Sequence, residues 1–159
     1  MTQITVYSDH VWFEDFIEGE KLAFGRFEMT RENMLAYAEL YDPEPFHTDE
    51  EEAKRLGWAG LIASGPQVVG TCRRMQKDGF PNAHVVISPG WDSIRWLKPV
   101  FPGDILSVRA TVELTKPLGS RPTEGLVKMD CHIVRQRGET VSTMMTNWFV
   151  TRRPDGAGG

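Results

Sequence analysis

An aspartate and a histidine lie five residues apart in a segment that proline stiffens. Asp42 and His47 bracket the run Asp-Pro-Glu-Pro-Phe-His, in which Pro43 and Pro45 each fix their own φ angle. Histidine titrates near neutral pH, and a nearby carboxylate can orient it or tune it. An acid and a histidine that converge on one water molecule form an acid–base pair. The spacing is compatible with a catalytic pair, although these residues taken alone favour a capping aspartate beside an exposed turn histidine.

A second segment that could take part in chemistry begins a predicted helix. Ser64 and Gly65 precede Pro66, and a cap residue followed by proline is typical of a helix N-terminus. The amide of Gly65 would offer an unpaired N–H at the positive end of the helix dipole, where it can stabilise an oxyanion or an enolate. The alternative is an ordinary helix start, in which Ser64 acts as the cap and contacts no substrate.

Helices are predicted mainly in the first half of the chain. One helix should run from a cap at Thr30 to the residue before Pro43, because proline excludes the preceding residue from the α region. A second helix is predicted over residues 66–77, and its small apolar residues suit a buried central position. An edge strand, a loop and a short helical piece are predicted over residues 22–29, 42–52 and 51–56.

Strands are predicted in the second half of the chain. Residues 106–114 and 127–133 alternate apolar and polar side chains with a period of two, which is typical of strands with one buried face. Further strands are predicted over residues 84–97 and 140–151. Helices segregated from consecutive antiparallel strands indicate an α+β fold, and the simplest packing wraps a curved sheet around the helix at residues 66–77.

The composition fits one soluble globular domain. The chain has 159 residues, of which 40% are hydrophobic and 25% charged, and its formal net charge is −4. A mildly acidic chain without a basic stripe is a poor candidate for binding nucleic acid. We see no signal-peptide pattern and no apolar run of membrane-spanning length, so we expect a cytoplasmic protein with no membrane partner. Cys72 and Cys131 are expected to be free core thiols.

Three short motifs, spread over most of the chain, resemble those of one enzyme family. The run Asp-Pro-Glu-Pro-Phe-His at residues 42–47 is similar to the Asp-x-Asn-Pro-hydrophobic-His signature of the MaoC-like dehydratases and (R)-specific enoyl-CoA hydratases. Residues 60–65 resemble the segment that leads into that family's central helix, and residues 96–104 resemble its Pro-Val-x-Pro-Gly-Asp turn. Residues 13–19 are similar to its first strand, so the resemblance covers about residues 12–152.

The resemblance implies a hot-dog fold, in which an antiparallel sheet wraps around a long central helix. This domain would occupy residues 1–153, and residues 154–159 would form a disordered tail. The resemblance also implies a homodimer or higher homo-oligomer with the active site near the subunit interface. The implied substrate is an acyl thioester of coenzyme A or acyl carrier protein, which gains or loses water across its α,β bond. Coenzyme A is then part of the substrate, and no metal or redox cofactor is expected.

The resemblance further assigns roles to individual residues. In the hydratases, the motif's aspartate and histidine activate water, and these roles map onto Asp42 and His47. A backbone amide at the start of the central helix polarises the thioester carbonyl, and this role maps onto Gly65. Water addition builds negative charge on the carbonyl oxygen, where one fixed N–H donor contributes about 3 kcal/mol. The candidate substrate-binding residues are Tyr41, Glu44 and Ser64.

Aromatic and basic residues outside these roles have simpler interpretations. Trp91 and Trp96 are predicted to be core or interface aromatics rather than ligand platforms. Tyr41 could line the acyl pocket, although packing in the core is favoured. Arg95 and Lys98 are predicted to be solvated charges, and contact with coenzyme phosphates is the alternative.

One residue departs from the signature, since Glu44 stands where the family has asparagine. An amide both donates and accepts hydrogen bonds, whereas an ionised carboxylate only accepts them. A second negative charge near Asp42 would raise the carboxylate pKa values and favour a protonated His47. The side chain of Glu44 could also point to solvent and change nothing, or it could mark altered substrate choice or lost activity.

Two other functions fit the same fold. A hot-dog thioesterase usually carries an acid on the central helix, but here the helix offers no carboxylate before Asp78 at its end. A non-catalytic acyl-thioester-binding protein is the second alternative, and Glu44 is the one residue that supports it.

Overall fold

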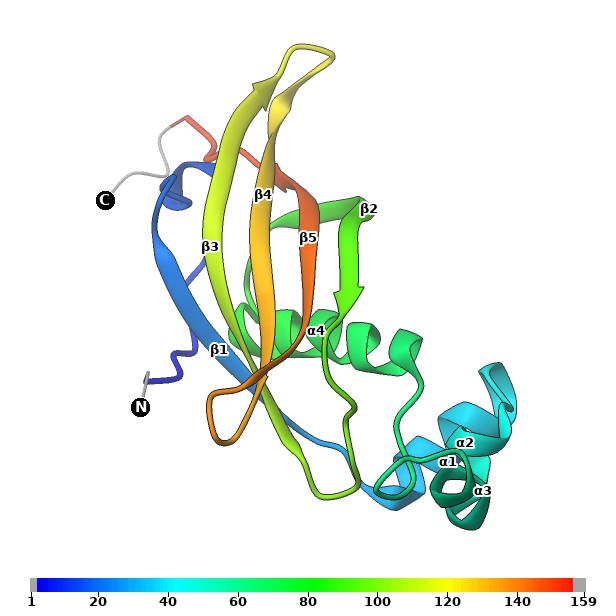
Figure 1. Ribbon diagram of the computed structural model, residues 1–159. Helices are drawn as coiled ribbons and strands as arrows, with labels where there is room; N and C mark the ends of the chain where they lie inside the picture. The colour runs from blue at the N-terminus through cyan, green and yellow to red at the C-terminus, as the bar shows by residue number, and fades with distance from the viewer. Residues whose placement is uncertain (1–2, 156–159) are drawn as a thin grey trace.

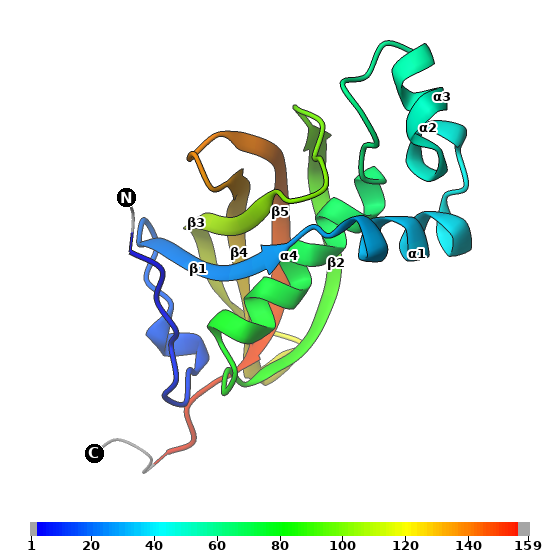
Figure 2. The ribbon, with the colours of Figure 1, turned by 90° about the horizontal axis from the view of Figure 1, so that it is seen from below.

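An antiparallel sheet curves around a long helix, α4 (Gly65–Gly79), which crosses one of its faces (Figures 1 and 2). The structure is a computed structural model and describes residues 3–155. The sheet has five strands in the order β1-β3-β4-β5-β2, so β1 and β2 form its edges. The expected α+β fold, with a sheet wrapped around a central helix, is confirmed. The strands are β1 (Lys21–Glu28), β2 (Val85–Trp96), β3 (Ile105–Leu118), β4 (Arg121–Arg135) and β5 (Thr140–Thr151).

The central helix α4 is held by an apolar side that faces the sheet. It begins one residue before the predicted range of residues 66–77 and ends two residues after it, with proline in its first turn as expected. The buried apolar side chains of α4 join alternate residues of β3, β4 and β5 in one core. The apolar side chains that α4 contributes to this core are Val68, Val69, Cys72 and Met75.

Close packing of β1 on α4 requires glycine. Gly25 has φ +76°, and a Cβ atom placed on it would lie 2.3 Å from Cβ of Met75. The pairing of β1 with β3 shifts register between Phe24 and Phe27, so Gly25 lies in a bulge that turns the backbone toward the helix. About one turn further along α4, a Cβ atom on Gly79 would lie 2.7 Å from Cβ of Phe24.

A group of three short helices lies beside the N-terminus of α4 and apart from the sheet (Figures 1 and 2). The predicted cap at Thr30 is confirmed, because its Oγ1 accepts the amide of Asn33 at 3.1 Å. The predicted loop at residues 42–52 is wrong in part, because Pro45 starts one short helix and Asp49 caps the next. The helices are α1 (Arg31–Tyr41), α2 (Pro45–Thr48) and α3 (Glu50–Arg55), and a 3-10 turn, η1 (Phe13–Asp15), precedes them along the chain.

Several other expectations can be compared with the structure. Cys72 and Cys131 are free and buried, as predicted. The strands predicted from their residue patterns are present, and β3 and β4 extend beyond the predicted ranges into a long hairpin. Residues 13–19, which resemble the family's first strand, form no strand and include the turn η1. Within residues 3–155, no helix is long and apolar enough to cross a membrane. Most of the predicted tail, residues 156–159, lies outside the described residues.

We expect Gly25→Ala to destabilise the protein more than Gly19→Ala does. Both glycines have positive φ, +76° and +83°, so both substitutions strain the backbone by about 1–3 kcal/mol. Only at Gly25 does the new methyl group also collide with α4, since nothing lies within 4 Å of a Cβ atom on Gly19. The collision should add about 1–3 kcal/mol. Urea unfolding of both variants measures the difference, and equal losses would show that β1 is not tightly packed on α4.

Candidate active site

Asp42 and His47 meet at the junction of α1 and α2. Oδ2 of Asp42 lies 3.5 Å from Nε2 of His47. Asp42 is the residue at which α1 ends, and His47 is held within the single turn of α2 that Pro45 begins. The residue His47 is only 8% exposed, whereas the side chain of Asp42 is 29% exposed. The predicted pairing of the two side chains is therefore present, and the alternative of an exposed turn histidine is wrong.

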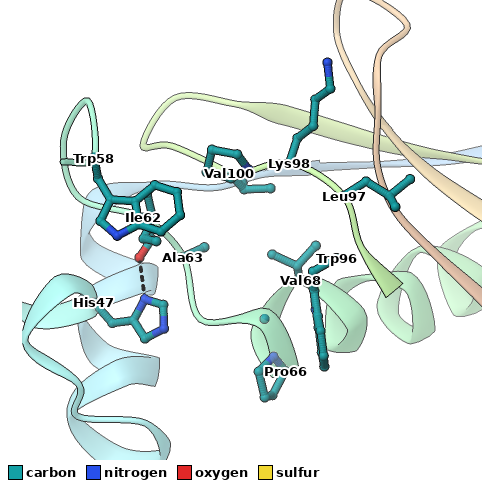
Figure 3. Close-up of a pocket in the computed structure, with 12 residues that line it drawn as sticks. His47, Trp58, Ile62, Ala63, Pro66, Val68, Trp96, Leu97, Lys98 and Val100 are labelled. Atoms are coloured by element: carbon teal, nitrogen blue, oxygen red, sulfur yellow. Dashed lines mark hydrogen bonds between the residues drawn. The ribbon is translucent and has the colours of Figure 1, made fainter. Parts of the chain in front are cut away.

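The ring of His47 is oriented by a main-chain carbonyl. Nδ1 of His47 lies 2.8 Å from the carbonyl oxygen of Ile62, as the dashed line in Figure 3 shows. Because a carbonyl only accepts hydrogen bonds, Nδ1 must carry a proton. In the neutral ring, Nε2 is then unprotonated and directed toward Asp42. The arrangement leaves a basic nitrogen beside a carboxylate that can stabilise its protonated form.

Ser64 connects this pair to the start of the central helix. Its hydroxyl is fully buried and donates a hydrogen bond of 2.6 Å to Oδ2 of Asp42. The residue occupies the N-cap position of α4, but its side chain makes no capping hydrogen bond. The predicted capping role of Ser64 is therefore wrong, because the hydroxyl is turned toward Asp42 and its oxygen accepts no amide from the first turn of α4. The bond ties Asp42 to the first residues of α4.

Gly65 is the first residue of α4, and an amide in the first turn has no partner within its own helix. The indole of Trp96 packs directly on it. A Cβ atom on Gly65 would lie 2.7 Å from both Cε2 and Nε1 of Trp96, so any larger residue would displace the indole. Gly65 thus combines a helix-start N–H with a backbone that an aromatic ring can approach closely.

A cavity of about 460 Å³ opens beside these residues (Figure 3). His47 and Gly65 both line it, and most of the other lining side chains are apolar. Lys98 is the one lysine or arginine among the described residues that line it, and its Nζ is paired with the carboxylate of Glu139. The remaining lining residues are Trp58, Ile62, Ala63, Pro66, Val68, Trp96, Leu97, Pro99 and Val100. The cavity is suited to an apolar group that reaches a histidine and a helix N-terminus.

Two of the predicted substrate-binding residues lie at the surface. Tyr41 is 68% exposed and packs beside Tyr37, so the favoured interpretation of Tyr41 as a core residue is wrong. Burial and then the negative charge of Asp42 raise the pKa of Tyr37, so the field of that carboxylate reaches this surface. Glu44 is exposed at the N-cap position of α2, where its carbonyl oxygen accepts the amide of His47 at 2.8 Å. Contact of Tyr41 or Glu44 with a substrate remains a prediction.

Sequence reasoning missed the tryptophans of the cavity. Trp96 is 54% exposed and lines the cavity, so it is not a core aromatic, and its alternative place at a subunit interface stays a prediction. Trp58 also lines the cavity and is 40% exposed. A signal was available, because Trp58 is a large aromatic residue that stands between Gly57 and Gly60, in a segment with no helical or strand period.

Comparison with known proteins identifies the family. The sequence profile of the family described as MaoC like domain matches residues 15–129. The chain belongs to this MaoC-like family. It is 34% identical to the MaoC-like dehydratase from Rhodospirillum rubrum, whose crystal structure superposes with a TM-score of 0.83 over 91% of this chain and 99% of that one.

Two hydratases are also similar to this chain, one in fold and one in part of its sequence. The R-hydratase from Pseudomonas aeruginosa is 19% identical and shares the fold, with a TM-score of 0.73 over 91% of this chain and 88% of that one. The mesaconyl-CoA hydratase of Cereibacter sphaeroides is 36% identical over 74 residues, which are 46% of this chain and 21% of that protein. The resemblance inferred from residues 42–47 and the two other motifs is thus confirmed at the level of the family.

We expect Ser64 and Asp42 to be energetically coupled. A buried hydrogen bond to a charged group contributes about 1.5–3 kcal/mol, so Ser64→Ala should lower the free energy of unfolding by an amount in that range. In an Asp42→Asn background the acceptor has lost its charge, and the same serine substitution should cost markedly less. A double-mutant cycle in urea measures the difference as a coupling energy of about 1–2 kcal/mol. Additive losses would mean that the hydroxyl does not hold this carboxylate.

Proposed function

We propose that the protein is a hydratase or dehydratase of acyl thioesters, with Asp42 and His47 as its acid–base pair. It would add water across the α,β double bond of an enoyl thioester, or remove water from the 3-hydroxyacyl thioester. The observation that carries the proposal is the convergence of Nε2 of His47 on Oδ2 of Asp42, 3.5 Å apart, beside a cavity that Gly65 also lines. A base, a carboxylate and a helix-start amide are the parts that such a reaction uses.

The proposed chemistry begins with proton transfer to histidine. As the oxygen of a water molecule bonds to the β-carbon, Nε2 of His47 takes one proton from that water, and the carboxylate of Asp42 stabilises the imidazolium. The π electrons move toward the carbonyl oxygen and form an enolate, which accepts a hydrogen bond from the amide of Gly65. The imidazolium then returns the proton to the α-carbon. One water is consumed and no electron is transferred, so we propose that the reaction needs no metal and no redox cofactor.

Ser64 has a supporting role in this proposal. Its hydroxyl donates to the same oxygen of Asp42 that faces His47. The bond leaves the carboxylate fixed between a donor on α4 and the imidazole on α2, so the negative charge stays where the imidazolium forms. Ser64 would therefore be a positioning residue, and the substrate contact predicted for it is not required.

The relatives support the reaction class, and they do not decide whether coenzyme A or acyl carrier protein carries the acyl group. One relative is named as a mesaconyl-CoA hydratase, and the solved structures with this fold include R-hydratases and a 3R-hydroxyacyl-ACP dehydratase complex. We propose a thioester of coenzyme A or acyl carrier protein as the substrate. We also propose self-association, because the edge strand β2 and the residues after it expose a row of large apolar side chains in the single chain. These side chains are Val86, Ile87, Trp91, Trp96 and Leu97.

The test is a two-channel assay with crotonyl-CoA. We expect the absorbance of the conjugated enoyl group to fall without release of free thiol, because water adds to the β-carbon and the thioester survives. Asp42→Asn and His47→Ala should each lower kcat by about 10²-fold or more, the usual contribution of acid–base catalysis. Release of thiol would instead establish a thioesterase, and binding without either signal would establish an acyl-thioester-binding protein.

A second pair of a histidine and an aspartate, elsewhere on the chain, provides the control for these substitutions. Nε2 of His132 lies 3.2 Å from Oδ2 of Asp130, and both side chains are more exposed than those of the proposed site. Neither residue lines the cavity beside His47. Asp130→Asn and His132→Ala should therefore leave the rate at the wild-type value. A loss of activity in these control variants equal to that in the site variants would remove the proposed assignment.

A further prediction concerns the residue that departs from the signature. The side chain of Glu44 is exposed and makes no capping bond to α2, while its carbonyl oxygen accepts the amide of His47. We expect Glu44→Asn to change kcat by less than about 5-fold, because an exposed charge contributes at most ~1 kcal/mol. Steady-state kinetics with crotonyl-CoA measures this ratio. A gain of about 10²-fold or more would show that the carboxylate suppresses catalysis in the natural chain.

A further inference from the structure

Two tryptophans lie on opposite sides of the proposed active-site cavity (Figure 3). Trp58 lies in the segment after α3, and Trp96 is the last residue of β2. Both indoles are partly exposed, at 40% and 54%. A tryptophan that is left partly exposed beside a cavity offers a large apolar face to a ligand. The two side chains are therefore available to contact different parts of a substrate.

The order of groups in an enoyl thioester determines which end of the cavity would hold the acyl chain and which end would hold the coenzyme. Its carbonyl carbon stands between the sulfur and the α,β double bond. If the carbonyl oxygen binds the amide of Gly65 and the β-carbon faces His47, the sulfur must point away from His47. Figure 3 shows Trp58 on the same side of the cavity as His47 and Trp96 on the other side. The indole of Trp96 packs on Gly65 itself, so it lies next to the position of the carbonyl and the sulfur.

Charge along the cavity agrees with this direction. Lys98 follows Trp96 closely in the chain and is the one lysine or arginine among the described lining residues. Its partner Glu139 lies in the turn between β4 and β5, at the protein surface. Figure 3 shows the side chain of Lys98 pointing out of the cavity, toward solvent, which is where the phosphates at the far end of a coenzyme arm would lie. On the side of His47, Trp58 and Ile62 present apolar surface, which suits an uncharged acyl tail.

We propose that Trp58 closes the acyl end of the cavity and limits the chain length of the acyl group, whereas Trp96 lines the end that holds the coenzyme arm. This inference rests on the function proposed above and adds the substrate class, which is a short, uncharged enoyl thioester. Trp58 is positioned by the preceding turn, because its amide donates to the carbonyl of Ala53 at 3.0 Å and Gly57 has φ +94°. The backbone that presents this indole is therefore anchored to α3.

Two readouts separate the roles of the two tryptophans. The first is the ratio of kcat/KM for 2-octenoyl-CoA to that for crotonyl-CoA, which reports on the acyl end. The second is the dissociation constant of free coenzyme A, which has no acyl group and reports on the arm. Trp58→Ala should raise the first ratio by about 10-fold, because one removed steric conflict changes selectivity by at least that factor. Trp96→Ala should weaken binding of free coenzyme A by about 10-fold and leave the chain-length ratio unchanged.

Two other exposed apolar residues supply the controls. Leu56 and Ile17 are 49% and 60% exposed and do not line the cavity. Leu56→Ala and Ile17→Ala should change neither readout. The inference is overturned if the effects of Trp58→Ala and Trp96→Ala are exchanged, or if both variants change both readouts equally. Failure of the wild-type protein to hydrate either thioester would instead refute the proposed function, and the free coenzyme A measurement would still report on Trp96.

Discussion

The geometry of the site depends on the hydrogen bond from Ser64 to Asp42. The bond joins two segments that are 22 residues apart, and it links the group of short helices to the start of the helix that the sheet surrounds. A second bond, from His47 to the carbonyl of Ile62, joins the same two segments. With both bonds formed, the carboxylate, the imidazole and the helix-start amide occupy fixed positions relative to one another. Neither segment alone would place these three groups around one cavity.

The position of α4 depends in turn on glycine residues, which have no side chain. Gly25 and Gly79 let β1 and α4 approach so closely that a single Cβ atom would collide with the facing residue. Gly65 has the same property toward Trp96, but there the ring that fills the space also lines the cavity. Packing and chemistry therefore impose the same requirement on the start of α4, because a larger residue would both displace the indole and alter the surroundings of the helix-start amide.

Sequence reasoning predicted the fold and the central pair because both depend on local signals. Period-two alternation marks β3 and β4, and the prolines around Asp42 and His47 restrict the backbone whatever surrounds it. The role of Ser64 could not be predicted in this way. Serine before a helix is usually a cap, and only the tertiary structure brings the carboxylate of Asp42 within 2.6 Å of its hydroxyl. The helix α2 was missed because its four residues are too few to show a period.

Position 44 shows why a signature and a structure can carry different information. A signature compares side chains, and by that comparison a glutamate in place of asparagine changes both charge and hydrogen-bonding capacity. In the structure, this residue acts on the site through its main chain, because its carbonyl oxygen accepts the amide of His47 and so starts the turn that carries the imidazole. Any residue except one that disturbs this turn can supply that carbonyl. The departure at position 44 is thus compatible with an intact acid–base pair, and the constraint on the motif falls on the prolines and on the two residues that meet.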